Sequence, residues 1–269
     1  MLTTKRVALG AALLLGAGAA HAAPLVTNTL DATALANAIG GSGITISNAS
    51  LTYNTEIPAA TFTNGASSVG FGSGIVLTTG TTGCVTGSNN QNGCTGAGSS
   101  SSLKFDFTST SGQVFFNYVF GSEEYTQYVG SGFNDRFELR LNGVNIAQLP
   151  GGGGIVSINN INCSSNSAFY RNNVDGESNQ PAGCVNQNLD IQLDGLTTVL
   201  TASALVNPGL NTFEFFITDM GDSNLDSAVF IQGGSFSSEP PPTNGVPAPA
   251  PLALIGIAAL GWAAVSRRA

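Results

Sequence analysis

The prediction of the fold begins with residues 114–120, which read VFFNYVF. Alternate residues are apolar from Val114 to Phe120, which is the period-2 pattern of a β-strand. The residues between them are also mostly apolar, as Phe115 and Val119 show. A strand with two apolar faces is covered on both sides, so we expect it to be central in its sheet.

The same alternation recurs on both sides of this stretch, in segments 103–107, 137–141, 213–217 and 229–231, and residues 74–78 form a further short apolar run that stops at Gly80. About ten strands separated by Gly, Asn and Ser turns predict an all-β fold, an antiparallel β-sandwich of the jelly-roll kind. The one helix signal covers residues 31–40, with Asp31 as N-cap. The absence of helices between the strands argues against a parallel α/β sheet.

The N-terminus has the pattern of a secretory signal peptide. Lys5 and Arg6 precede an apolar run over residues 7–20, and Ala20-His21-Ala22 supplies an A-x-A cleavage site. We expect signal peptidase to remove residues 1–23 by cleavage after Ala22 or Ala23. The alternative interpretation is a buried first helix.

The C-terminus has two parts. Residues 237–251 hold six of the eleven prolines, which predicts an extended linker. Residues 252–269 contain an apolar run, interpreted as a transmembrane helix, and a basic tail with Arg267 and Arg268.

These C-terminal features resemble the PEP-CTERM sorting signal. The resemblance rests on Val246-Pro247-Ala248-Pro249, the apolar helix and the arginine pair, with Ala248 where the signal usually has Glu. It implies processing by an exosortase in a Gram-negative bacterium, after export across the inner membrane. The chain would contact the membrane through its C-terminal helix before processing. The alternative is an ordinary C-terminal membrane anchor.

Charge and histidine content exclude several functions. Between residues 24 and 251 the chain has sixteen acids against four bases, Lys104, Arg136, Arg140 and Arg171, a net charge of −12. A chain this acidic lacks the cations that bind nucleic acid. The single histidine, His21, leaves with the signal peptide, which excludes Ser-His-Asp catalysis and histidine-ligated zinc. We therefore expect no enzyme.

Four cysteines remain, Cys84, Cys94, Cys163 and Cys184. An even number in an exported chain predicts two disulfides, for which three pairings exist. We favour Cys84–Cys94 and Cys163–Cys184, because each closes a short loop and short loops meet most often.

Two Gly- and Asn-containing loops at strand ends gather carboxylates. We expect them to form one or two Ca²⁺ sites, because the ion prefers hard oxygen ligands and close carboxylates repel one another without a cation. One alternative is ordinary solvated turns, with Arg136 and Arg140 as ion-pair partners. The other is catalysis by a carboxylate pair. The proposed ligands are Glu123, Glu124, Asp135, Asp219, Asp222 and Asp226.

Residues 24–236 resemble the choice-of-anchor L domain. The resemblance rests on GIVLTTG at 74–80, FNYVFGSEEY at 116–125, FNDRFELRLNG at 133–143 and ITDMGDSNLDSAVFI at 217–231, in the right order. The family's name implies a surface protein whose members carry different C-terminal anchors, PEP-CTERM among them. The resemblance implies no particular activity.

The sequence thus predicts a secreted or surface-sorted, non-enzymatic protein of the extracellular matrix or exopolysaccharide layer. We expect an adhesive or structural role, stabilised by calcium, with exopolysaccharide as a partner. Two other functions stay open: a secreted, carboxylate-dependent polysaccharide hydrolase and a calcium-dependent carbohydrate-binding module.

Overall fold

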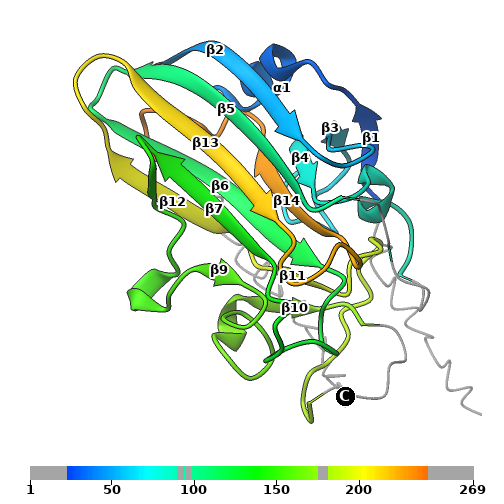
Figure 1. Ribbon diagram of the computed structural model, residues 1–269. Helices are drawn as coiled ribbons and strands as arrows, with labels where there is room; N and C mark the ends of the chain where they lie inside the picture. Colours follow the sequence, from blue (N-terminus) through cyan, green and yellow to red (C-terminus); the bar gives the residue numbers. More distant parts are fainter. Residues whose placement is uncertain (1–22, 90–93, 95–97, 175–180, 242–269) are drawn as a thin grey trace, which may run out of the picture.

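The computed structural model describes residues 23–89, 94, 98–174 and 181–241 (Figure 1). The signal peptide up to Ala22 and the tail from residue 242 onward lie outside these residues, including the sorting motif and the expected membrane helix. In the described part of the chain, no helix is long and apolar enough to cross a membrane.

One α-helix precedes the main body of strands. Helix α1 covers Ala32–Ile39, and the Asp31 carboxylate caps it by accepting hydrogen bonds from the backbone N–H groups of Thr33 and Ala34. This N-cap satisfies amides that have no partner within the helix. Leu35, Ala36 and Ile39 are buried, so the helix packs one face on the sandwich.

The strands form two antiparallel sheets stacked as layers, as expected for a β-sandwich (Figure 1). The first sheet has the order β1-β3-β4-β14-β6-β11-β10, and β12 also pairs with β6. Its strands are β1 (Leu25–Asn28), β3 (Ala59–Thr63), β4 (Gly74–Thr78), β6 (Gln113–Ser122), β10 (Tyr170–Asn172), β11 (Gly195–Thr197), β12 (Leu200–Leu205) and β14 (Ser227–Gln232).

The second sheet has the order β2-β5-β13-β7-β8, with β9 also paired to β7. Its strands are β2 (Ile44–Tyr53), β5 (Ser100–Ser109), β7 (Arg136–Leu141), β8 (Val144–Asn145), β9 (Val156–Ser157) and β13 (Asn211–Thr218). Three 3₁₀ turns complete the elements, at Thr82–Val85, Pro150–Gly152 and Ser167–Phe169.

The main core lies between the sheets and is dominated by phenylalanine. Phe105 and Phe213 from the second sheet and Phe116 from the first are fully buried. Phe236, from the segment after β14, packs against them, with ring centroids 5.0 Å from Phe213 and 5.2 Å from Phe105. Aromatic rings at these separations add to the free energy gained by area burial.

A second, smaller core covers the other face of the first sheet. Val119 and Phe230 project to this side, where Leu189, Ile191 and Leu193 of a loop pack over them. Strand β6 is therefore covered on both faces and lies between β14 on one side and β11 and β12 on the other. This confirms the prediction that the 114–120 stretch is a central strand.

The folded unit reaches slightly beyond residue 236. Ser237 and Ser238, at the start of the Pro-rich segment, are 7% and 3% exposed. Ser237 exchanges two backbone hydrogen bonds with Phe115 of β6. The extended chain thus begins after these serines.

Candidate metal centre

Strand ends from both sheets meet at one end of the sandwich. In the second sheet, Thr218 at the end of β13 pairs with Arg136 at the start of β7, which places Asp219 next to Asp135. In the first sheet, Ser227 at the start of β14 pairs with Ser122 at the end of β6, just before the two glutamates. The register of four strands therefore gathers acids that are far apart in the sequence.

Asp135 occupies the middle of this end and is fully buried. Its carboxylate accepts a 2.9 Å hydrogen bond from the Met220 backbone N–H and a 2.7 Å bond from the Ser227 hydroxyl. Burial raises its pKa, while these hydrogen bonds act in the opposite direction. Arg136 does not neutralise it in the structure, because its guanidinium pairs with Glu138 at 3.0 Å.

Asp219 and Glu124 are buried without hydrogen-bond donors. Asp219 is 6% exposed and Glu124 is 1% exposed. Among the described residues, no N–H or hydroxyl donor reaches either oxygen of Asp219 or the Oε2 atom of Glu124, and Asp219, when protonated, donates a hydrogen bond to the Asp135 carboxylate. Burying an unpaired carboxylate charge costs free energy, so such a group takes up a proton or pairs with a cation.

The pKa values of these two groups reflect that environment. Burial, with added repulsion from Asp135 and Asp222, raises the pKa of Glu124 to about 8. Burial also raises the pKa of Asp219, and the negative charge of Asp135 raises it further. Both carboxyls therefore favour the neutral form near pH 7 unless positive charge is supplied.

Asp222 completes the group from the solvent side. Its side chain is exposed, and its carboxylate accepts a 3.1 Å hydrogen bond from the Asn224 backbone N–H. Gly221 turns the chain just before it with φ +102°, a conformation that glycine adopts at little cost. We call Glu124, Asp135, Asp219 and Asp222 the acidic cluster.

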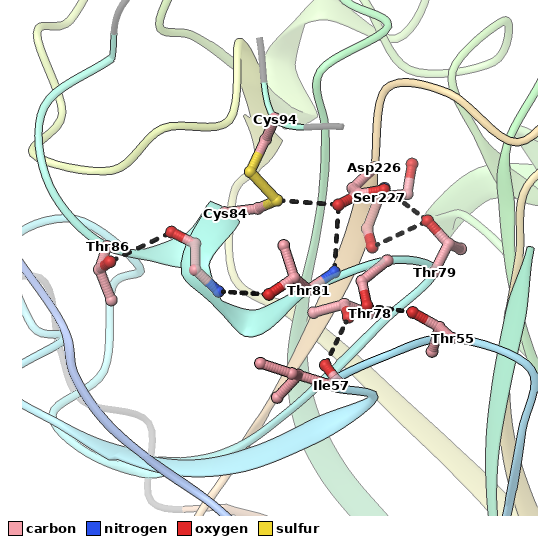
Figure 2. The surroundings of a disulfide bond; sticks show 12 residues. Thr55, Ile57, Thr78, Thr79, Thr81, Cys84, Thr86, Cys94, Asp226 and Ser227 are labelled. Carbon is pink, nitrogen blue, oxygen red and sulfur yellow. Dashed lines mark hydrogen bonds between the residues drawn. A yellow bond between two sulfur atoms is a disulfide. The ribbon is translucent and has the colours of Figure 1, made fainter. Parts of the chain in front are cut away.

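Asp226, another expected ligand, points away from the acidic cluster. Its carboxylate is turned toward the first disulfide, where it accepts a 3.1 Å hydrogen bond from the Thr81 backbone N–H and lies 2.9 Å from Cys84 Sγ (Figure 2). Glu123, also expected as a ligand, is 3% exposed, and its backbone N–H donates a 3.1 Å hydrogen bond to the Asp226 carbonyl oxygen. The structure thus brings Glu124, Asp135, Asp219 and Asp222 together and turns Asp226 toward the disulfide.

Both disulfides have the pairing expected from the sequence. Cys84–Cys94 and Cys163–Cys184 have Cα–Cα separations of 5.3 and 5.7 Å. Cys84, Cys94 and Asp226 are, within the described ranges, a group of three potential ligand side chains with atoms within 4.8 Å of one another. Because both sulfurs are committed to the disulfide, these cysteines offer no thiolate to a metal.

No three carboxylates of the acidic cluster have ligand atoms within 4.8 Å of one another among the described residues. A bound cation would therefore bring these carboxylates closer together. Exposed Asp222 is the member with room to move. The donor set consists entirely of carboxylate oxygens, which fits a hard divalent cation such as Ca²⁺.

Sequence reasoning did not identify Ser227 as part of this end. Its hydroxyl donates to Asp135, and its backbone N–H donates to Thr79 Oγ1 over 2.9 Å. A serine at the start of an apolar strand gives no sequence signal for this role. Only the pairing of β14 with β6 brings it to Asp135.

Comparison with known families agrees with the fold and with the sequence resemblance. The family model of the choice-of-anchor L domain matches residues 24–237, which includes every strand described above. No curated protein and no solved structure matches the chain significantly. On the strength of this match, the chain belongs to the choice-of-anchor L domain family.

Proposed function

We propose that this protein is a non-enzymatic structural or adhesive module of the bacterial cell surface or extracellular matrix, stabilised at one end by Ca²⁺. Family membership supports a surface or secreted protein. The signal-peptide pattern and the C-terminal segment at 246–269 support export and sorting by exosortase in a Gram-negative bacterium.

The observation that carries the calcium proposal is the pair of buried carboxylates without donors. Asp219 has two such oxygens and Glu124 has one. Turn residues exposed to water would not need a counter-charge, because solvent would satisfy them. These oxygens are shielded from water, so a bound cation would stabilise them more than it would stabilise exposed carboxylates.

The acidic cluster would supply the ligands. Asp135 accepts hydrogen bonds from the Met220 backbone N–H and the Ser227 hydroxyl, and an ion would replace the proton that it shares with Asp219. Asp219 and Glu124 would contribute their donorless oxygens, and Asp222 would close the site from outside. Extracellular calcium modules bind at about 10⁻⁴ to 10⁻³ M, so the ion would be structural.

The same burial speaks against a polysaccharide hydrolase at this place. A glycosidic bond must reach both catalytic carboxyls. Glu124, Asp135 and Asp219 are 1%, 0% and 6% exposed. A polymer chain would contact exposed Asp222 but could not reach the three buried carboxyls.

A second candidate function, calcium-dependent carbohydrate binding, is favoured by a pocket of about 320 Å³ beside the Cys163–Cys184 disulfide. Ser167, Tyr170 and Gln187 are among its lining residues, a polar set with one aromatic wall. The Tyr170 ring lies 4.8 Å from that of Tyr125, the residue after Glu124. An ion at the acidic cluster would thus stabilise the pocket wall.

Retention on exopolysaccharide isolated from the producing bacterium tests these functions. We expect the polysaccharide to retain the mature chain in 5 mM Ca²⁺ and to release it when a chelator is added. We also expect the chain to produce no new reducing ends in the polysaccharide. Asp222→Asn should weaken retention, whereas Glu56→Gln, which removes an exposed charge at the same end of the sandwich but outside the acidic cluster, should not. Loss of retention in Gln187→Ala at unchanged melting temperature would favour the binding module.

Two results would contradict the proposal. Reducing ends released by the wild-type chain and abolished in Glu124→Gln would establish a hydrolase. Absence of retention in both calcium and chelator would remove the matrix role.

A further inference from the structure

The chain leaves the sandwich at the end opposite the acidic cluster. Ser237 pairs antiparallel with Phe115, so the following residues run toward the turn between β5 and β6. There the Ser111 hydroxyl donates a 2.7 Å hydrogen bond to the Ser238 carbonyl. We call this end of the sandwich the exit end.

Three large apolar side chains are exposed at the exit end. Leu205, Leu210 and Val144 are 79%, 63% and 65% exposed. Leu205 pairs with Gln113, the first residue of β6. Leu210 precedes Asn211, whose side chain accepts a 2.8 Å hydrogen bond from Asn142, two residues before Val144. The three residues therefore lie at the exit end, Leu205 at the end of β12, Val144 at the start of β8 and Leu210 just before β13.

The two ends of the sandwich differ sharply in charge. The exit-end loops at 41–44, 109–113, 142–144 and 205–211 contain no Asp, Glu, Lys or Arg, and Glu239 is the charged residue beside the chain exit. The acidic cluster lies beyond the far end of β6, which is ten residues long and thus spans about 30 Å. In Figure 1 the β12–β13 hairpin lies at the upper left, and the arrowheads of β13 and β6 point to the lower right.

We propose that the exit end is a membrane-facing surface, on which Leu205, Leu210 and Val144 enter the interfacial layer of a lipid bilayer while the chain is tethered. This inference rests on the proposed anchoring through residues 252–269. The ten residues 242–251 separate that segment from the described chain and, when extended, span about 30 Å. The exit end can therefore reach the bilayer surface.

Charge favours the same orientation. Anionic headgroups repel acidic groups within about a Debye length of the surface. Docking through the exit-end loops, which contain no charged residue, keeps the acidic cluster some tens of ångströms from the lipid. Exposed leucine and valine side chains gain free energy when they leave water for the acyl boundary.

Fluorescence quenching by brominated lipids tests the orientation. Trp262 is the single tryptophan of the chain and lies in the proposed anchor, so it reports anchor insertion directly. In a Trp262→Phe background, Leu210→Trp or Leu205→Trp reports the exit end. Val185→Trp is the matched control, because Val185 is 74% exposed next to the second disulfide.

The full chain would be reconstituted in phosphatidylethanolamine–phosphatidylglycerol vesicles with brominated acyl chains. We expect quenching of Trp262, and at least threefold stronger quenching of Leu210→Trp and Leu205→Trp than of Val185→Trp. Quenching of Trp262 with equal, weak quenching at all three probes would overturn the docking surface and leave anchoring intact. An unquenched Trp262 would overturn the anchoring and, with it, the docking.

Discussion

The hydroxyl of Ser227 donates a 2.7 Å hydrogen bond to the carboxylate of Asp135, and this bond joins the two sheets of the sandwich. Ser227 begins β14 in the first sheet, and Asp135 directly precedes β7 in the second. Asp135 therefore has a structural role in addition to any contact with an ion. Unfolding in chelator measures the structural role alone, and unfolding in calcium measures both.

Replacement of Asp135 should destabilise the fold with or without calcium. Asp135→Ala leaves the buried Ser227 hydroxyl and the Met220 amide without an acceptor, at a cost of about 2–4 kcal/mol in the free energy of unfolding. Asp135→Asn keeps one acceptor oxygen and should cost less. Urea unfolding in the presence of chelator measures both, and equal stability of Asp135→Ala and wild type would contradict the structural role.

Without divalent cations, stability should fall as the pH rises. Glu124 has a folded-state pKa of about 8 against an ordinary value of 4.5, so between these values the native chain holds a proton that the unfolded chain releases. The free energy of unfolding then decreases through this range and levels off above it. Thermal unfolding in chelator should show this trend, which Glu124→Gln should reduce and Glu56→Gln should leave unchanged. A stability that rises from pH 5 to pH 8 in the wild type would contradict it.

The Cys84–Cys94 disulfide should stabilise the loop that packs on Asp226. The Cys84→Ala/Cys94→Ala variant should lose about 2–4 kcal/mol, because the unfolded chain is no longer cross-linked. Peptide mapping without reduction should recover both local pairs, and a peptide that links the Cys84 region to the Cys184 region would refute this pairing.

Both ends of the chain should be removed in the native host. Intact-mass measurement should show a start at Ala23 or Pro24 and loss of the C-terminal apolar segment, as the A-x-A site and the tail predict. A mature species that runs from Met1 to Ala269 would contradict the sorting interpretation.

The sequence predicted the architecture because its long strands repeat a clear signal. The alternation in 213–217 and 137–141 matches β13 and β7, and the expected helix at 31–40 is found at Ala32–Ile39. Short strands such as β8, β9 and β11 were not predicted, because two or three residues are too few to show an alternating pattern.

The acidic site was predicted less completely for a geometric reason. Loop composition showed that carboxylates gather, but not where each side chain points. Asp226 precedes Ser227 by one residue, yet its carboxylate lies against Cys84 while Ser227 faces Asp135. Neighbouring residues at a strand end face opposite sides, and the choice between sides depends on the register with β6.

Thermal unfolding of the mature chain with and without calcium shows whether the acidic cluster binds the ion. At 100 times the dissociation constant the ion should add about 2.7 kcal/mol, which raises the melting temperature by roughly 5–10 °C for a domain of this size. Asp222→Asn should abolish most of this rise and should not lower the melting temperature in chelator, because Asp222 is exposed and its charge only repels the rest of the cluster. Glu56→Gln should retain the full rise. A wild-type melting temperature unchanged by 10 mM Ca²⁺, or raised equally by Mg²⁺ at the same ionic strength, would contradict a calcium site at the acidic cluster.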